Sequence, residues 1–305
     1  MRASMSRRGW LLFAAMCVIW GIPYLLIKVA VEDMSPALLV LGRTAIAALI
    51  LLPIAAARSE LRPALRHWRP VLAFAAIEIA LPWLLLGEAE TEISSSLTGL
   101  LIAATPLVGT AIALTTGARE RLSLDRALGL LLGIAGVAAI VGVSVEGASI
   151  VPIAEVGVVA VCYAVGPVIL QRWLTGVPAL GVIAASLAVT AVAYVPVVAL
   201  SNPQLDATAE AVGSVVGLAV VCTALAFLLF FALIAEIGPV RATVITYVNP
   251  AVAAILGVVV LSEELTLGMG VGFVLVLAGS VLATRPVAPR AAARQRTLEP
   301  AATDG

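Results

Sequence analysis

The sequence predicts an all-α integral membrane protein, with ten transmembrane helices arranged as two inverted five-helix repeats. Three observations support this prediction. Of the 305 residues, 62% are hydrophobic and 12% are charged, whereas soluble domains carry about 25% charged residues. The second half of the chain repeats features of the first half, and the basic residues cluster on one side of the predicted spans.

The apolar stretches have the length that a bilayer requires. A hydrocarbon core of about 30 Å is crossed by roughly 20 apolar residues in a helix. Lipid offers no hydrogen-bond partner to the backbone, so each stretch must satisfy its own amides as a helix. Ten stretches fit these conditions, at about 10–30, 36–57, 70–87, 93–116, 125–143, 152–171, 178–200, 211–235, 239–261 and 266–284.

Matching features recur about 143 positions apart. Glu120-Arg121-Leu122 leads into Gly129 and Gly136, as Glu263-Glu264-Leu265 leads into Gly272 and Gly279. The prolines recur too: Pro23 with Pro167, Pro36 with Pro178, Pro53 with Pro196 and Pro106 with Pro250. Because each unit holds five spans, an odd number, the second copy is expected to cross the membrane in the opposite direction. Such inverted repeats are typical of secondary transporters, whose substrate site lies near the midplane.

The repeat and the charges together set the expected organisation. Lys28 and Arg43 are the basic residues inside the spans, and the other arginines lie in the tails or beside alternate connections, all on one side. By the positive-inside rule that side is cytoplasmic. We therefore expect a protein of the cell (inner) membrane with both termini in the cytoplasm. We expect a cytoplasmic tail at 1–9, repeats at 10–143 and 152–284, and a disordered cytoplasmic tail at 285–305.

Residues that would indicate catalysis or metal binding are sparse. Cys17, Cys162 and Cys222 lie within spans at spacings that suit no metal, and His67 is the only histidine. We therefore expect no enzyme activity, no catalytic residue, no metal or other cofactor and no nucleic-acid partner. The expected partners are a small-molecule substrate and the lipid bilayer.

Motifs along the chain resemble a known family. In order they are Trp20-Gly21-Ile22-Pro23-Tyr24 with Lys28, Gly42-Arg43, Ser94-Ser95-Ser96-Leu97, Ala104-Thr105-Pro106-Leu107, Asn249-Pro250-Ala251 and Glu263 onward. Their order and spacing over about 10–284 resemble the EamA-type transporters of the drug/metabolite transporter superfamily. The resemblance implies ten helices in two inverted repeats, cytoplasmic termini and a central cavity. It fixes no substrate, because members of the family move amino acids, drugs and other metabolites.

Glu78 is the most conspicuous candidate for a functional residue. It lies about eight residues into the third predicted span, roughly 12 Å deep at 1.5 Å per residue. A carboxylate at this depth is costly, which favours a neutral, paired or hydrated group. Glu78 is therefore either a cavity residue that binds a cation or exchanges a proton, or an interhelical hydrogen-bond partner with a structural role.

The two basic residues inside the spans have similar alternatives. Arg43 stays charged, so it binds a substrate carboxylate or forms an outer gate, or it caps carbonyls or pairs with Glu32 or Asp33. Lys28 either faces the cavity or extends its ammonium group to the interface.

Polar and aromatic side chains complete the candidate substrate site. Serine and threonine also link transmembrane helices by hydrogen bonds, so each has a structural alternative. The remaining candidates are Trp20, Tyr24, Trp83, Ser95, Thr98, Tyr163, Thr223, Thr243, Tyr247 and Asn249.

Glycines mark one face of each repeat's last span. Gly129, Gly133 and Gly136 line span five, and Gly268, Gly272 and Gly279 line span ten. Small residues at this spacing allow close helix packing. Spans five and ten are therefore expected to form a scaffold or a homodimer face.

The sequence thus favours a secondary transporter that exports a small amino-acid-like or amphipathic metabolite across the bacterial inner membrane by alternating access. A phosphorylated-metabolite exchanger is one alternative, and it would need several basic groups at the midplane. A membrane scaffold or sensor that transports nothing is the alternative from a different class.

Overall fold

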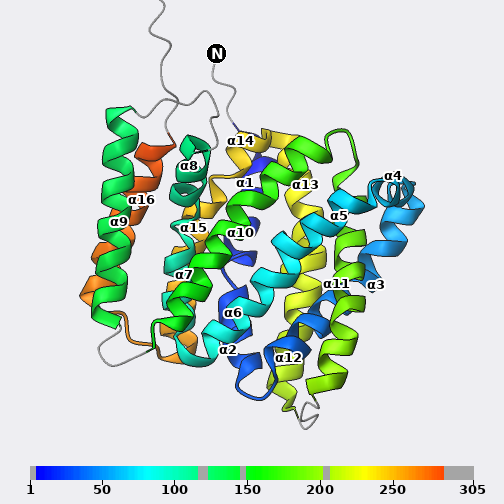
Figure 1. Ribbon diagram of the computed structural model, residues 1–305, viewed down its shortest axis with the longest axis horizontal. Coiled ribbons are helices and arrows are strands. Elements are labelled where there is room, and N and C mark those ends of the chain that lie inside the picture. The colour runs from blue at the N-terminus through cyan, green and yellow to red at the C-terminus, as the bar shows by residue number, and fades with distance from the viewer. Residues whose placement is uncertain (1–4, 116–122, 145–148, 202–206, 285–305) are drawn as a thin grey trace, which may run out of the picture.

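The computed structural model describes residues 5–115, 123–144, 149–201 and 207–284, and all regular elements in these ranges are helices. The helices form one bundle, in which α1 begins and α16 ends on the same side (Figure 1). We call this side the terminal end and the opposite side the far end. The expected tail at 285–305 lies outside the described residues.

The first repeat contains five spans, of which three are divided into shorter helices. Their bounds are α1 (Arg7–Ile19) and α2 (Pro23–Val31) for span one, α3 (Pro36–Ala57) for span two, α5 (Trp68–Phe74), η1 (Ala75–Ala80) and α6 (Leu81–Glu92) for span three, α7 (Ser95–Ile102) and α8 (Thr105–Thr115) for span four, and α9 (Leu124–Ser144) for span five. The short helix α4 (Leu61–Arg66) joins spans two and three.

The second repeat also contains five spans, and it begins at the far end of the bundle (Figure 1). Its helices are α10 (Val151–Trp173), α11 (Ala179–Ser201), α12 (Ala209–Ala219) with η2 (Val220–Leu225) and α13 (Ala226–Ile237), α14 (Pro239–Ala242) with α15 (Ile245–Leu261), and α16 (Leu267–Ala283). Eight segments are long and apolar enough to cross a membrane, and α15 and α16 are shorter apolar helices. The chain therefore has the predicted ten-helix membrane fold.

Span three extends beyond its predicted end, and span one is interrupted. Span three runs over Trp68–Glu92 and not 70–87. Glu88, Glu90 and Glu92 therefore belong to the last turns of α6 and not to a loop, because the segment reaches Ile93 before its backbone becomes extended. Span one is interrupted after α1, which ends at Ile19 with Trp20 as its C-cap, and Pro23 starts the new helix α2.

Side-chain caps fix several helix starts. Ser35 Oγ accepts a hydrogen bond from Leu38 N–H at 3.3 Å, with Pro36 in the first turn of α3. Thr208 and Thr266 cap α12 and α16 in the same way. These caps satisfy backbone N–H groups that have no partner within their own helix.

The main interhelical contacts join the two repeats. Spans two and seven pack through α3 and α11, spans four and nine through α7 and α15, and spans five and ten through α9 and α16. Span one packs on span eight through α2 and α12, just as span six packs on span three through α10 and α6. Exchanging the repeats leaves this set of pairs unchanged, as expected for an inverted repeat.

The glycines of spans five and ten face each other within one chain. A Cβ at Gly129 would lie 2.5 Å from Ala283 N, and a Cβ at Gly136 would lie 2.7 Å from the Gly272 carbonyl oxygen. This packing brings the two backbones together. The glycine faces are therefore already used between the repeats.

Both repeats carry a π-helix in the middle of their third span. In span three η1 covers Ala75–Ala80, and in span eight η2 covers Val220–Leu225. π-helical turns are rare and are often found at functional sites. The fourth residue of η1 is Glu78, and the fourth residue of η2 is Thr223.

Candidate functional site

Six of the predicted site residues come together near the middle of the bundle, and we call them the central group. They are Tyr24 of α2, Arg43 of α3, Glu78 of η1, Trp83 of α6, Tyr163 of α10 and Thr223 of η2. Tyr163 connects them, because it lies within electrostatic reach of Glu78, Arg43 and Tyr24. The group draws on spans one, two and three of the first repeat and on spans six and eight of the second.

Arg43 has uncharged partners. Its guanidinium carbon lies 3.5 Å from the ring centroid of Trp83, and its Nε donates a hydrogen bond to Thr223 Oγ1 at 3.0 Å. The Arg43 side chain is 5% exposed. Of its guanidinium nitrogens, Nε is the one that donates a hydrogen bond to a described residue. The expected alternative of a pair with Glu32 or Asp33 is not seen among the described residues, and Asp33 accepts a hydrogen bond from Thr208 instead.

Glu78 projects from η1 onto the backbone of α10. A Cβ at Gly166 would overlap its Oε2 atom, so glycine is needed for this close contact. Oε2 is buried and accepts no hydrogen bond from the described residues. A carboxyl oxygen in this position is available to a proton, a water molecule or a bound cation.

The π-helices position the group from both repeats. In η2, Thr223 Oγ1 donates to the Leu218 carbonyl at 2.8 Å while accepting from Arg43, so both functions of the hydroxyl are used. At the end of η1, Tyr194 of α11 donates to the Ala80 carbonyl at 2.8 Å. Each wide turn is therefore stabilised by a side-chain hydrogen bond.

Trp20 and Asn249 belong to the interruption of span one. Gly21 N–H bonds to the Val18 carbonyl, which leaves the Cys17 carbonyl without its usual partner in the helix. With its amide oriented to satisfy both neighbours, Asn249 donates to that Cys17 carbonyl at 3.1 Å. Trp20 packs on Phe230 of α13, with ring centroids 4.7 Å apart.

The other five predicted residues lie outside the central group. Thr98 bonds back to the Ser94 carbonyl, and Thr243 is exposed at the end of α14. Tyr247 Oη lies 3.3 Å from Thr284 Oγ1 at the terminal end. Lys28 and Ser95 lie at the far end, in the cluster described next.

A polar cluster at the far end contains residues that the sequence did not single out as a site. Lys28 Nζ donates to the Glu90 carbonyl at 2.6 Å and to the Ile93 carbonyl at 3.1 Å. Glu263 accepts from Ser95 N–H at 2.8 Å and from Ser96 N–H at 2.9 Å. Glu263 therefore caps α7 from the connection between α15 and α16.

The capping interaction sets the charge state of Glu263. Burial alone would raise the pKa of its carboxyl, but the hydrogen bonds from Ser96 and Ser95 outweigh burial and lower the pKa below its usual value. The carboxylate form is thus the one that stabilises the start of α7.

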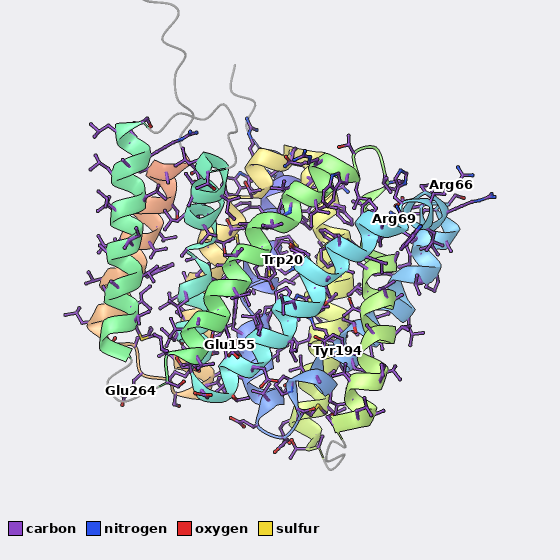
Figure 2. The ribbon with its side chains drawn as sticks, viewed as in Figure 1. Trp20, Arg66, Arg69, Glu155, Tyr194 and Glu264 are labelled. Carbon is purple, nitrogen blue, oxygen red and sulfur yellow. The ribbon has the colours of Figure 1, made fainter. Side chains whose placement is uncertain are left out.

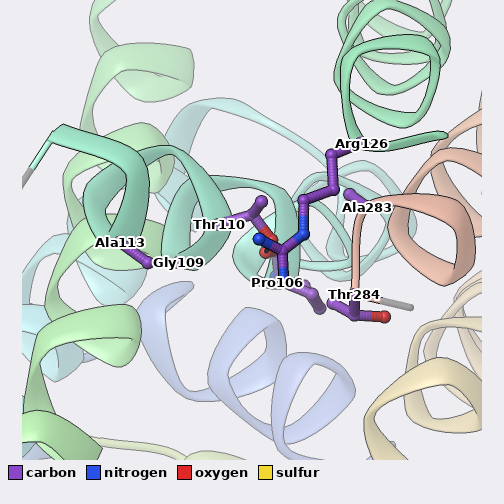
Figure 3. A pocket seen from close by; sticks show the side chains of 7 residues that line it. All are labelled: Pro106, Gly109, Thr110, Ala113, Arg126, Ala283 and Thr284. Carbon is purple, nitrogen blue, oxygen red and sulfur yellow. Dashed lines mark hydrogen bonds between the residues drawn. The ribbon is translucent and has the colours of Figure 1, made fainter. Parts of the chain in front are cut away.

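A pocket of about 260 Å³ opens elsewhere, between α8, α9 and α16. Figure 3 shows Arg126 extending from α9 toward Thr110 and Thr284. The pocket is lined by Pro106, Gly109, Thr110, Ala113, Arg126, Ala283 and Thr284. None of these is a predicted substrate-binding residue. Its position at the terminal end separates it from the central group.

Sequence reasoning did not single out Gly166 or Glu90, whose burial and contacts the structure shows. Gly166 precedes Pro167, which the repeat had marked, so its place on the helix was visible but its contact with Glu78 was not. Glu90 lies beyond the predicted end of span three at residue 87, yet it is 0% exposed. The alternation of exposed Glu88 and Glu92 with buried Glu90 depends on a helical turn that the sequence alone did not reveal.

Comparison with known proteins identifies the group to which this architecture belongs. The model of the EamA-like transporter family matches residues 7–142 and again 156–285. The chain belongs to the EamA-like transporter family. It is therefore a multi-pass membrane transporter of the drug/metabolite transporter superfamily, with one family unit in each repeat.

Individual relatives agree with this placement. The chain is 27% identical over 296 residues to "Uncharacterized transporter YvbV" from Bacillus subtilis, covering 94% of this chain and 95% of that protein. A crystal structure 22% identical in sequence superposes with a TM-score of 0.66, covering 90% of this chain and 96% of its own. At that identity the second comparison supports the fold alone.

Proposed function

We propose that this EamA-like protein exports a small zwitterionic or amphipathic metabolite, such as an amino acid, by alternating access at the central group. The observation that carries the proposal is Arg43, a buried cation that is held by Trp83 and Thr223 and has no carboxylate partner among the described residues. Its remaining N–H groups suit a substrate carboxylate. Glu78, which like Arg43 lies within electrostatic reach of Tyr163, suits an ammonium group or a proton.

The remaining predicted site residues fit this proposal as supporting positions. Trp20 and Asn249 border the group at the interruption of span one, and Ser95, Thr98, Thr243, Tyr247 and Lys28 lie along the two halves of the bundle. We keep the expected units at 10–143 and 152–284, related by rocking about the central group. No catalytic step, cofactor or nucleic-acid partner is part of the proposal.

Metabolite profiling tests this function directly. Cells that express the protein should accumulate an amino-acid-like solute in the medium, relative to cells that express Arg43→Gln at equal membrane abundance. The solute found in this way should then exchange in proteoliposomes. Equal profiles for the two strains across all amine-containing metabolites would contradict the proposal.

Proton coupling through Glu78 is the second part of the proposal. Glu78→Gln should keep the fold, because the amide has the size of the neutral acid, and it should abolish the pH dependence of transport. Glu155→Gln is the matched control, because Glu155 lies near Glu88 and Glu92 at the far end. A normal pH profile in Glu78→Gln would make Glu78 a structural residue and the protein a facilitator.

The phosphorylated-metabolite exchanger is less well supported by the geometry. It would need several cations at the centre, and the described residues place Arg43 there while Lys28 binds carbonyls at the far end. A scaffold or sensor that transports nothing would not need a buried arginine held by two neutral side chains.

We propose a cell-membrane location with the terminal end in the cytoplasm. Figure 2 shows Arg66 and Arg69 toward the terminal end, and Glu155 and Glu264 toward the far end. This distribution supports the positive-inside orientation. In intact cells an impermeant thiol reagent should label cysteine at position 92 and not at position 66. A cysteine at position 90 should not be labelled, because this position is buried.

A homodimer through spans five and ten would use their outward faces. Leu131 and Ile134 on α9 and Val274 on α16 are each more than half exposed, whereas the glycines pack within the chain. Disulfide cross-linking at position 134 in native membranes tests this assembly, and its absence would indicate a monomer.

A further inference from the structure

The far-end cluster contains a buried acid that the central group does not use. Glu90 is 0% exposed, and neither of its carboxyl oxygens has a hydrogen-bond partner in the described chain. Burying an ionised carboxylate without a donor costs much more free energy than burying the neutral acid. Closure of the protein around Glu90 is therefore coupled to the proton on this side chain.

Lys28 connects this acid to the packing of span one. Its Nζ bonds to the backbone carbonyls of Glu90 and Ile93, at the end of α6. Carbonyls in the last turn of a helix lack partners within the helix, and the helix dipole favours a cation there. The ammonium group thus links α2 to α6 through the backbone, while the carboxyl group beside it remains unpaired.

The charges around Glu90 come from two packed elements. From α2, Lys28 and Tyr24 lie within electrostatic reach of Glu90. From the connection between α15 and α16, Glu263 also lies within reach, and its carboxylate is already bound to the N-terminus of α7. On α10, Glu155 interacts with Glu88 and Glu92 instead.

These contacts join the helices that must separate for the far end to open. Besides α6, α2 packs on α7 and α12. One turn below Glu90 on α6 lies Leu86, which is 3% exposed. Access of solvent to Leu86 from the far end requires this layer to part.

We propose that Glu90 is a second proton-binding site, and that with Lys28 it forms a latch that closes the far end when Glu90 is protonated. Loss of the proton to the far-end solution leaves a carboxylate, which draws Lys28 Nζ away from the carbonyls of Glu90 and Ile93. The link between α2 and α6 is then broken, and the far end opens. In the proposed transport cycle the latch would make opening depend on pH at the far end.

Cysteine accessibility tests the latch without a substrate, so its outcome does not depend on the proposed function. In a background with Cys17, Cys162 and Cys222 replaced by alanine, Leu86→Cys is labelled by a small thiol reagent in nanodiscs, where both faces meet the buffer. The labelling rate is divided by that of Thr91→Cys, an exposed position on the same helix, which removes the pH dependence of the thiol itself.

The expected rate ratio rises with pH, by up to about tenfold per pH unit while Glu90 is mostly protonated. In Glu90→Gln the ratio should stay low and constant, and in Glu92→Gln, a carboxyl control at the exposed end of α6, it should rise as in the parent. An unchanged pH dependence in Glu90→Gln overturns the proposal. Lys28→Gln, which removes the link, should raise the ratio at low pH, and a ratio as low as in the parent would also overturn it.

Discussion

The third spans of the two repeats have the same backbone and different chemistry. Each is interrupted by a π-helix at the same place, yet the fourth residue is Glu78 in η1 and Thr223 in η2. The charged residues of the central group follow the same division. Glu78 and Arg43 belong to the first repeat, whereas the second repeat contributes Thr223, Tyr163 and Gly166 to the contacts around them.

The two repeats thus share their backbone geometry, while the charged groups of the central group lie in one of them. An inverted repeat needs equivalent helix packing in both halves so that the halves can exchange positions. A substrate with unlike ends needs unlike groups. The first repeat therefore supplies the charges, and the second supplies the neutral side chains that position them.

The largest expected effect tests that division at Arg43. Arg43→Gln should lower transport by about 100-fold or more, because a charged donor to a buried carboxylate contributes about 1.5–3 kcal/mol per hydrogen bond. Thr223→Val, which removes the neutral partner, should cost about tenfold, or roughly 1.4 kcal/mol. Initial rates in proteoliposomes give both values. Equal losses would show that the two repeats share the chemistry evenly.

The contact between Gly166 and Glu78 gives the next largest effect. Gly166→Ala should destabilise the protein by about 1–3 kcal/mol through overpacking, and it should slow transport because the new Cβ would overlap Glu78 Oε2. Gly157→Ala on the same helix is the control, because a Cβ there meets nothing within 4 Å. Thermal unfolding in detergent measures both variants. If the two behaved alike, Gly166 would not be the close contact between the repeats.

The fold was largely predictable from the sequence, and the site was predictable only in part. The length of each apolar stretch and the recurrence of the prolines can be seen in the sequence itself. The ten helices, and the inversion that follows from five spans per repeat, could therefore be predicted. The partners of Arg43 could not, because its contact with Thr223 joins residues 180 positions apart. The buried state of Glu90 depended on one more helical turn than the apolar pattern indicated.

A smaller effect is expected at Thr105 and Asn249, the residues before the paired prolines Pro106 and Pro250. Thr105 Oγ1 donates to the Ile102 carbonyl at 2.7 Å, whereas Asn249 donates to the Cys17 carbonyl of another span. Asn249→Ala should therefore cost about 1–2 kcal/mol, since it leaves a buried carbonyl unsatisfied. Thr105→Ala should cost less than about 1 kcal/mol, because it removes a hydrogen bond local to its own segment. Equal shifts in melting temperature would refute this ranking.

The smallest effect concerns the contact by which the second repeat caps the first. The native pKa of Glu263 is lowered by its hydrogen bonds from Ser96 and Ser95, although burial acts in the opposite direction. The carboxylate is thus favoured in the folded state, so its contribution to stability is full above the usual carboxyl pKa of about 4.3 and is lost as pH falls through the lowered native value. Near neutral pH, Glu263→Gln should lower the free energy of unfolding by less than about 1 kcal/mol. This loss should appear as a small decrease in melting temperature. The substitution should also reduce the further loss of stability on acidification.

Glu264→Gln is the matched control, because Glu264 is exposed beside Glu263, and this variant should keep the acid sensitivity of the parent. If acidification destabilised Glu263→Gln as much as it destabilises the parent, the cap on α7 would not depend on the charge of Glu263.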